Sequence, residues 1–194
     1  MKNKPITLIS YNRHKFTEYV HLFKPLPLKL DPLDPSFKGL LLEDGDTFTA
    51  NAIQKVSQIP LDNQFVFAED SGLVIPALNG APGIYSRRYS GIDDAHANNR
   101  KVLKNMQSVT DRSAYFVAVI ALKDLAGELH LFEGRCDGFI HTEEVGTTGH
   151  GYDPIFIPVG YAKTFAELGL EEKSRISHRH KAAKKLIEYL KVHV

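Results

Sequence analysis

The chain alternates short apolar runs with longer amphipathic stretches, and this alternation predicts its strands and helices. Residues 6–9 form an apolar run of strand length, and residues 10–15 are polar and precede a helical stretch ending near Phe23. Pro25 and Pro27 follow and terminate that helix. The polar loop therefore lies at a helix N-terminus, a position that favours anion binding.

The middle of the chain repeats this order. Residues 32–39 predict a loop, and residues 47–59 predict a helix with Asp46 or Thr47 as its N-terminal cap. Residues 65–68 predict a short buried strand. We expect the strand to end there, where the sequence turns polar.

The second half supplies a helix over 93–106, a hairpin of strands over 114–122 and 128–132, and a glycine-rich loop over 146–151. The last helix begins near Ser177. Because strands and helices interleave, the predicted class is α/β, with a long mixed sheet flanked by helices. We expect residues 1–194 to form one domain, either compact throughout or divided into two lobes by a cleft.

Charge and composition narrow the choice of partners. The formal net charge is only +1, so we expect neither nucleic acid nor a membrane surface as a partner, and a phosphate ligand needs local cationic clusters. The longest apolar run, over 114–122, is about half of a membrane span. Cys136 is the only cysteine and is expected to be a packed or half-exposed strand thiol. Because one cysteine cannot form an intrachain disulfide, a reducing, cytoplasmic location is the simplest assumption.

The first polar cluster is Ser10, Asn12 and Lys15, in the loop after the first strand. A hydroxyl, an amide and an ammonium group suit a triphosphate chain. A polar helix cap followed by a solvated lysine is the alternative. The chain contains no Gly-Lys-Ser/Thr phosphate loop, which disfavours a kinase or a GTPase.

The second cluster combines Glu43 with Asn51 and Lys55, which are four residues apart and share one helical face. Glu43 precedes the helix, where its carboxylate could coordinate a cation. An acidic loop that caps a helix explains the same residues equally well.

The third cluster is Glu69-Asp70-Ser71-Gly72. Two adjacent carboxylates at the end of a buried strand are costly unless a cation or several donors compensate them. Mg²⁺ prefers oxygen ligands, usually one or two carboxylates together with substrate phosphate oxygens. A neighbouring carboxylate can also accept the proton of an attacking water.

The fourth cluster is divided between the glycine-rich loop and the start of the last helix. Its glycines allow close backbone approach, and His150 and Tyr152 offer flat faces for a base. A solvated basic helix is the alternative for the second part, and the spacing of His178 and His180 disfavours zinc. The members of the cluster are His150, Gly151, Tyr152, Asp153, Lys173, Ser177, His178 and Arg179.

In this order the clusters closely resemble the inosine triphosphate pyrophosphatase family, which removes ITP, dITP and XTP. The resemblance extends from residue 10 to residue 179, and the ordered set of motifs is far more specific than any one of them. The motifs are Ser10-x-Asn12-x-x-Lys15, Glu43-x-Gly45-x-Thr47-Phe48-x-x-Asn51-Ala52-x-x-Lys55, Glu69-Asp70-Ser71-Gly72-Leu73, Gly80-Ala81-Pro82-Gly83-Ile84-Tyr85-Ser86, Gly149-x-Gly151-Tyr152-Asp153-Pro154-Ile155-Phe156 and Ser177-His178-Arg179.

The resemblance implies an elongated fold, a cleft between two lobes and a homodimer. It also implies that Asp70 is the general base and, with Glu43 and Glu69, a ligand of Mg²⁺. Two larger sets follow from it. Phosphates and sugar would be held by Ser10, Asn12, Lys15, Asn51, Lys55, Ser71 and Lys173. The base would be enclosed by His150, Gly151, Tyr152, Asp153, His178 and Arg179.

Four positions depart from the family pattern. Tyr11 stands where many relatives have glycine, and Leu42 stands where many have an acid. Ala50 replaces a common glutamate, and His150 replaces an aromatic residue that stacks on the base. The shape of the phosphate loop, the acids of the metal site and the base preference are therefore open.

The predicted reaction is attack of an activated water on the α-phosphorus, with pyrophosphate as the leaving group and Mg²⁺ as the cofactor. Donors facing the 6-keto oxygen would select deaminated purines, because adenine would leave such a donor unpaired at a cost of roughly 1–3 kcal/mol. Two alternatives remain: a phosphohydrolase that releases orthophosphate, and a nucleotide sensor without turnover.

Overall fold

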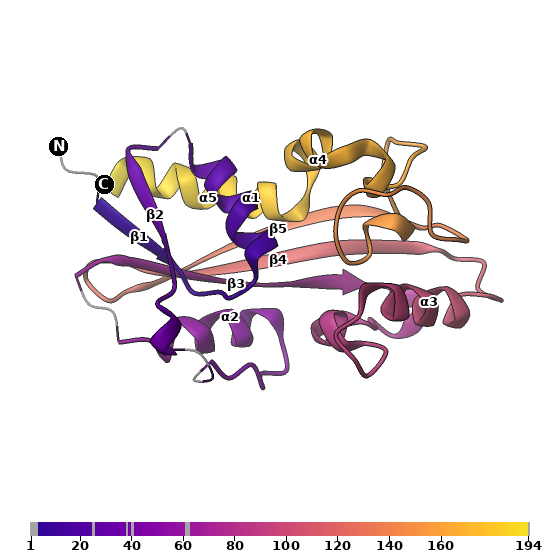
Figure 1. Cartoon of the computed structure of the whole chain (residues 1–194), viewed down its shortest axis with the longest axis horizontal. Helices are drawn as coiled ribbons and strands as arrows, with labels where there is room; N and C mark the ends of the chain where they lie inside the picture. Colours follow the sequence, from indigo (N-terminus) through magenta and orange to yellow (C-terminus); the bar gives the residue numbers. More distant parts are fainter. Residues whose placement is uncertain (1–3, 25, 38, 40, 61–62, 194) are drawn as a thin grey trace. The chain divides into compact units, whose positions relative to one another are not determined.

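A six-stranded mixed sheet forms the centre of the structure, a computed structural model that describes residues 4–24, 26–37, 39, 41–60 and 63–193 (Figure 1). The strand order is β2-β1-β3-β4-β5-β6. β1 pairs in parallel with β2 and β3, whereas β5 and β6 are antiparallel. The predicted α/β class with a mixed sheet is therefore confirmed.

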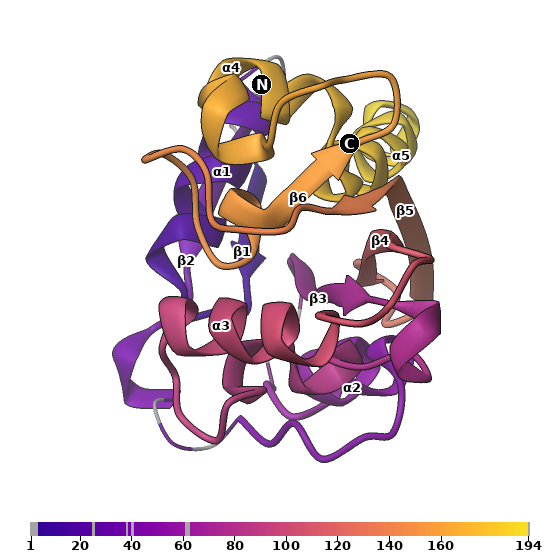
Figure 2. The same cartoon turned by 90° about the vertical axis from the view of Figure 1, so that its right-hand side faces the viewer.

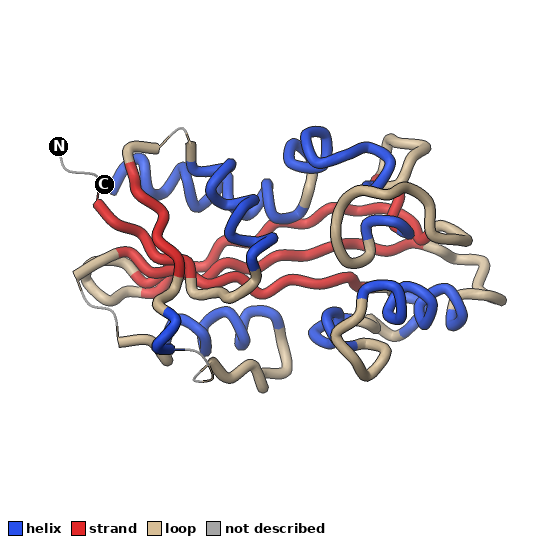
Figure 3. Tube along the Cα trace, viewed as in Figure 1, coloured by secondary structure: helices blue, strands red, loops and turns tan. Residues whose placement is uncertain are grey.

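The elements have the following bounds, and Figure 3 shows them by type. The strands are β1 Lys4–Leu8, β2 Leu28–Pro32, β3 Phe65–Val74, β4 Ser113–Lys123, β5 Leu129–Ile140 and β6 Phe156–Pro158. The α-helices are α1 Arg13–Phe23, α2 Phe48–Ser57, α3 Ala95–Asn105, α4 Phe165–Ile176 and α5 His178–His193. Short 3-10 helices are η1 Pro35–Phe37, η2 Pro76–Leu78, η3 Gly83–Arg88 and η4 Asp153–Ile155.

The chain divides into two compact units. The first contains Met1–Asp70, Ala118–Gly134 and His180–Val194, and the second contains Ser71–Val117 and Arg135–Arg179. The boundary in β3 falls between Asp70 and Ser71, so this strand supplies polar residues to both units.

In the first unit, helices cover both faces of the sheet (Figures 1 and 2). α1 and α5 lie on one face and α2 on the other. The strand β3 alternates accordingly, because successive side chains of a strand point to opposite faces. Phe65 and Phe67 belong to the core that includes Tyr19 and Phe23 of α1 and the apolar face of α5.

The second unit has its own apolar core. Aromatic rings from three elements form its centre, since Phe116 of β4 packs 4.7 Å from Phe156 of β6, and Phe156 packs 5.2 Å from Phe165 of α4. Leu73 and Val102 connect β3 and α3 to the same core. No helix among the described residues is long and apolar enough to cross a membrane.

Most of the predicted elements are found, including the first helix, which ends at Phe23. Pro25 lies outside the described residues. The expected loop over 32–39 contains a 3-10 turn, η1. The strand β3 corrects one prediction: it continues to Val74, so Glu69 and Asp70 lie within the strand and not after it. The strand continues through the two acids, and neighbouring donors compensate both of their side chains.

Two strands and one α-helix were not predicted: β2, β6 and α4. β2 is an edge strand that ends in Pro32, and proline is tolerated there because an edge strand leaves donors unpaired. α4 contains Gly169 at φ 80°, which kinks the helix and hides its periodicity. A capping box between Thr164 and Glu167 fixes its start.

Gly138 of β5 tests the packing of the second unit. It lies opposite Pro158, and a Cβ atom there would overlap the Ile157 carbonyl oxygen and the Phe156 ring. We expect Gly138→Ala to lower the free energy of unfolding by about 1–3 kcal/mol, because the backbone cannot yield without breaking the pair. Urea unfolding measures this, and exposed Glu133→Ala on the same strand should change it by less than about 0.5 kcal/mol. Equal values for the two variants would contradict the packing.

Candidate functional site

The N-terminal loop of the first unit is ordered by its own polar side chains. The Asn12 side chain accepts hydrogen bonds from the backbone N–H groups of His14 at 3.0 Å and Lys15 at 3.2 Å, which caps α1. The Ser10 hydroxyl accepts from the Asn12 backbone N–H at 3.1 Å. The helix cap considered from the sequence is therefore present, and it fixes the direction in which the Lys15 side chain points from α1.

Glu69 faces α1. One of its carboxylate oxygens, Oε1, lies 3.2 Å from Lys15 Nζ, and the other, Oε2, accepts a hydrogen bond from the Tyr19 hydroxyl at 2.6 Å. Lys15 Nζ also lies 3.3 Å from the Glu69 carbonyl oxygen, to which it donates. The Glu69 side chain is fully buried, so these donors stabilise its charge in place of water.

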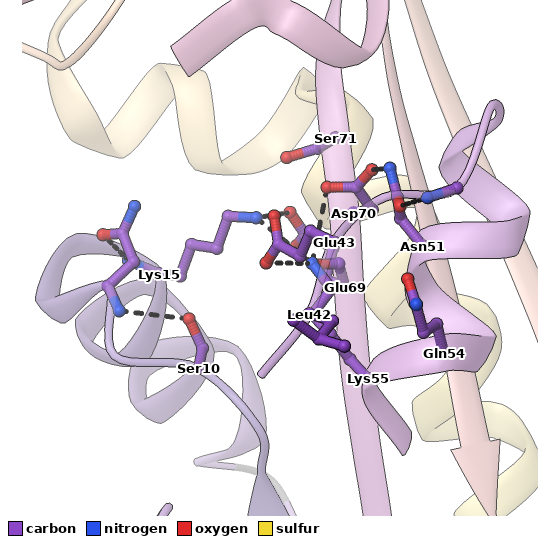
Figure 4. A network of polar contacts seen from close by, with 12 residues as sticks. Ser10, Lys15, Leu42, Glu43, Asn51, Gln54, Lys55, Glu69, Asp70 and Ser71 are labelled. Carbon is purple, nitrogen blue, oxygen red and sulfur yellow. Dashed lines mark hydrogen bonds and ion pairs between the residues drawn. The ribbon is translucent and has the colours of Figure 1, made fainter. Parts of the chain in front are cut away.

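Asp70 faces the opposite side of the sheet, toward α2 (Figure 4). Its Oδ2 accepts from Asn51 Nδ2 at 3.0 Å, and its Oδ1 lies 3.4 Å from Lys55 Nζ. Lys55 Nζ also lies 3.0 Å from Glu43 Oε1 and 2.9 Å from the Glu69 carbonyl oxygen. The buried ammonium of Lys55 thus connects the Glu43 loop to β3.

The loop that carries Glu43 is held against α2 through Asn51. Its Oδ1 accepts a hydrogen bond from the Gly45 backbone N–H at 2.9 Å. A Cβ atom on Gly45 would lie 2.9 Å from both that oxygen and the Ala50 Cβ. Glycine is required here because the loop backbone approaches the helix too closely for a side chain.

Besides Ala50, two further departures from the family pattern lie in the first unit. The Leu42 side chain is exposed, and its backbone is held by hydrogen bonds to and from the Gln58 side chain at 2.7 and 3.1 Å. The Tyr11 hydroxyl donates to the Asp34 carbonyl oxygen at 3.1 Å, which ties the N-terminal loop to the segment after β2. Because position 42 is leucine and not an acid, no carboxylate from this position lies beside Glu43.

The charges of this cluster do not balance. Two ammonium groups, of Lys15 and Lys55, face three carboxylates, of Glu43, Glu69 and Asp70. Within the described residues, no three His, Cys, Asp or Glu side chains gather as a ready-made metal site. Because Glu69 and Asp70 leave β3 on opposite faces, the two acids that Lys55 brings together are Glu43 and Asp70.

In the second unit, the glycine-rich loop closes around Asp153. Its Oδ2 accepts from the His150 backbone N–H at 2.7 Å and from Lys173 Nζ at 2.6 Å, and both charged side chains are buried. A Cβ atom on Gly149 would overlap the Asp153 carboxylate, so the close turn requires glycine. Asp153 and Lys173, which were predicted separately as site residues, are thus in contact, while the His150 side chain is exposed.

Other predicted residues of this unit are anchored to neighbouring elements. The Tyr152 hydroxyl donates to the Ser86 carbonyl oxygen at 2.7 Å, and burial raises the pKa of Tyr152, which keeps the phenol neutral. Arg179 Nη2 lies 3.4 Å from Ser71 Oγ. The buried His178 ring stacks on Phe116 with centroids 4.8 Å apart.

Two residues with contacts in these clusters were missed by sequence reasoning. Tyr19 is four residues after Lys15, and this helical spacing was a usable signal. Asn99 of α3 donates to the Gly151 carbonyl oxygen at 3.2 Å and to Glu144 Oε2 at 3.1 Å. A single asparagine within a helix gives no such signal, because its partners come from a distant loop.

Comparisons with known proteins show which family the chain resembles. The Ham1 family model matches residues 6–189. A dITP/XTP pyrophosphatase of Desulfotalea psychrophila is 42% identical over 91% of this chain and 81% of its own length. The Staphylococcus aureus Ham1 protein has a TM-score of 0.88 at 36% identity, covering 98% of this chain and 100% of that one. A HAM1 protein from Coxiella burnetii has a TM-score of 0.87 at 37% identity, covering 97% and 98%.

The buried pair of Lys173 and Asp153 gives a stability test. We expect Lys173→Met to lower the free energy of unfolding by about 3–5 kcal/mol, because it leaves the Asp153 carboxylate buried without its cation. Adding Asp153→Asn should restore part of that loss, since the amide is neutral and still accepts from His150. Urea unfolding of the single and double variants checks both statements. A Lys173→Met protein as stable as the wild type would show that the pair does not hold the loop.

Proposed function

The chain belongs to the Ham1 family, and we propose that it hydrolyses the nonstandard purine nucleoside triphosphates ITP, dITP and XTP to the monophosphate and pyrophosphate. The observation that carries the proposal is the setting of Asp70, whose two carboxylate oxygens are held by Asn51 and Lys55. The printed name of the Desulfotalea psychrophila relative, dITP/XTP pyrophosphatase, supports this substrate class.

Mg²⁺ is the proposed cofactor, with Glu43 and Asp70 as its protein ligands. The donor set fits, because both residues offer carboxylate oxygens and the cluster carries one more carboxylate than ammonium groups. The bound ion would supply charge neutralisation of the phosphates and acidify a water. The role of Glu69 as a third ligand stays a prediction, and its contacts with Lys15 and Tyr19 favour a different one.

Asp70 is proposed as the general base. The Asn51 amide donates to Oδ2 and the Lys55 ammonium contacts Oδ1, so the carboxylate is fixed in direction. As the water oxygen bonds to the α-phosphorus, its proton passes to Asp70. The bond from the α-phosphorus to the bridging oxygen breaks, and pyrophosphate leaves with that oxygen.

The triphosphate is proposed to bind at the start of α1. Lys15 and Lys55 supply positive charge, and Ser10 and Asn12 shape the loop. Asn51 and Ser71 complete this part of the set. Because overall charge is close to neutral, these local groups carry the attraction for phosphate.

The base is proposed to be read by the second unit, through His150, Gly151, Tyr152, Asp153, His178 and Arg179, while Lys173 is proposed to contact phosphate or sugar oxygens. His178 and Arg179 are buried, so a donor from either that met an adenine amino group would lose a hydrogen bond at a cost of roughly 1–3 kcal/mol. A 6-keto oxygen would accept it. Assembly as a homodimer and a cytoplasmic location stay predictions.

A nucleotide panel tests the reaction. We expect ITP, dITP and XTP to be hydrolysed at least about tenfold more efficiently than ATP, which corresponds to 1.4 kcal/mol of discrimination, with Mg²⁺ required. Pyrophosphate and orthophosphate are assayed separately, without an added pyrophosphatase. Orthophosphate as the sole inorganic product, or full activity in EDTA, would contradict the proposal.

Asp70→Asn tests the general base. The amide cannot accept the water's proton, so we expect kcat to fall by at least about 100-fold, while triphosphate binding in EDTA stays within about tenfold of the wild type. Asp44→Asn, which changes an exposed acid of the Glu43 loop, is the matched control and should keep its activity. If Asp70→Asn retains more than about a tenth of the wild-type rate, Asp70 is not the base.

A further inference from the structure

A tyrosine hydroxyl lies in the middle of the first unit's aromatic core. Tyr19 is 0% exposed, and its ring packs edge-on against Phe23 at 5.8 Å and Phe67 at 5.0 Å. Phenylalanine would fill the same space without a polar atom. Burying a hydroxyl costs free energy unless it is hydrogen-bonded. The role of the Tyr19 hydroxyl can therefore be inferred from its hydrogen-bond partner.

That partner is the Glu69 carboxylate, at 2.6 Å. Tyr19 donates to Oε2, whereas Lys15 Nζ lies 3.2 Å from Oε1, so the two oxygens of one carboxylate are divided between two side chains of α1. Lys15 and Tyr19 are one helical turn apart and face β3 together. The Asn12 cap fixes the start of that helix and therefore the positions of both residues along the helix axis.

The Glu69 carboxylate helps to determine the position of the Lys15 ammonium, which also donates to the Glu69 carbonyl oxygen at 3.3 Å. With the Tyr19 hydroxyl bound to Oε2, the carboxylate is held from one side and presents Oε1 to Lys15. Without the hydroxyl, a fully buried carboxylate would lose a donor. It would then draw the ammonium closer or change its orientation, and either shift moves Lys15 Nζ from the position that the structure gives it.

We propose that Tyr19 is a positioning residue for triphosphate binding, which acts by orienting Glu69 and, through it, the Lys15 ammonium. The proposal rests on the proposed function, in which Lys15 binds phosphate. Neither Tyr19 nor Glu69 contacts the substrate in this account. Glu69 serves as the support of a cationic side chain, on the face of β3 opposite to Asp70.

Tyr19→Phe removes one oxygen and keeps the ring. We expect the Kd of ITP in EDTA, measured by calorimetry, and the KM in Mg²⁺ to rise about fivefold, with kcat within about twofold of the wild type. Phe23→Leu is the matched control, because it disturbs the same aromatic core without touching Glu69. It should lower the urea midpoint and leave the Kd unchanged.

A double-mutant cycle separates positioning from general loosening of the fold. In a Lys15→Ala background, Tyr19→Phe should change the Kd by less than about 1.5-fold, because the group through which it acts is gone. Glu69→Gln provides a second route to the same test: it should weaken binding at least as much as Tyr19→Phe, and the two effects should not add.

Three results would overturn the proposal: unchanged affinity in Tyr19→Phe, an equal loss in the Lys15→Ala background, or an equal loss in Phe23→Leu. The failure of the proposed function is distinguishable from these, because it appears in the wild-type protein as an absence of pyrophosphate release. The calorimetric comparison in EDTA needs no turnover. It therefore decides the role of Tyr19 independently.

Discussion

Two adjacent carboxylates buried within one strand are the constraint on which the arrangement of the first unit depends. Glu69 and Asp70 leave β3 on opposite faces, where the Glu69 side chain is fully buried and the Asp70 side chain is only 12% exposed, so water contributes little to stabilising either charge. Each face must therefore supply its own donors. α1 provides Lys15 and Tyr19 on one side, and α2 provides Asn51 and Lys55 on the other. The positions of both helices are tied to this requirement.

Because Glu69 and Asp70 are adjacent in the sequence but lie on opposite faces of β3, they suit two different tasks. The Asp70 face gathers Glu43 and Lys55, which suits a cation and an activated water. The Glu69 face holds a lysine at the start of a capped helix, which suits the binding of phosphate. In the second unit, Asp153 accepts hydrogen bonds from Lys173 and from the His150 backbone N–H, and it thereby organises the glycine-rich loop.

The sequence indicated the class of fold and nearly all of the polar clusters, because ordered motifs and helical periodicity are local signals. It did not indicate the face on which each acid lies. Glu69 and Asp70 interrupt an apolar run, so the strand was expected to end before them, and only its continuation to Val74 places them on opposite sides. Gly169 concealed α4 in the same way, by breaking the period of a helix that packing restores. The only sequence signal for Tyr19 was its spacing of four residues from Lys15, which places both on one face of the helix.

The most direct test of these separate roles of Glu43 and Glu69 is the dependence of the hydrolysis rate on free Mg²⁺ at saturating ITP. The two variants to compare are Glu43→Gln and Glu69→Gln. If Glu43 and Asp70 are the metal ligands, Glu43→Gln raises the half-saturating Mg²⁺ concentration about 10- to 100-fold, the usual effect of disturbing a metal site. Glu69→Gln then leaves that concentration within about twofold of the wild type, since its carboxylate faces α1. A shift for Glu69→Gln as large as that for Glu43→Gln would contradict the account and restore Glu69 as a ligand.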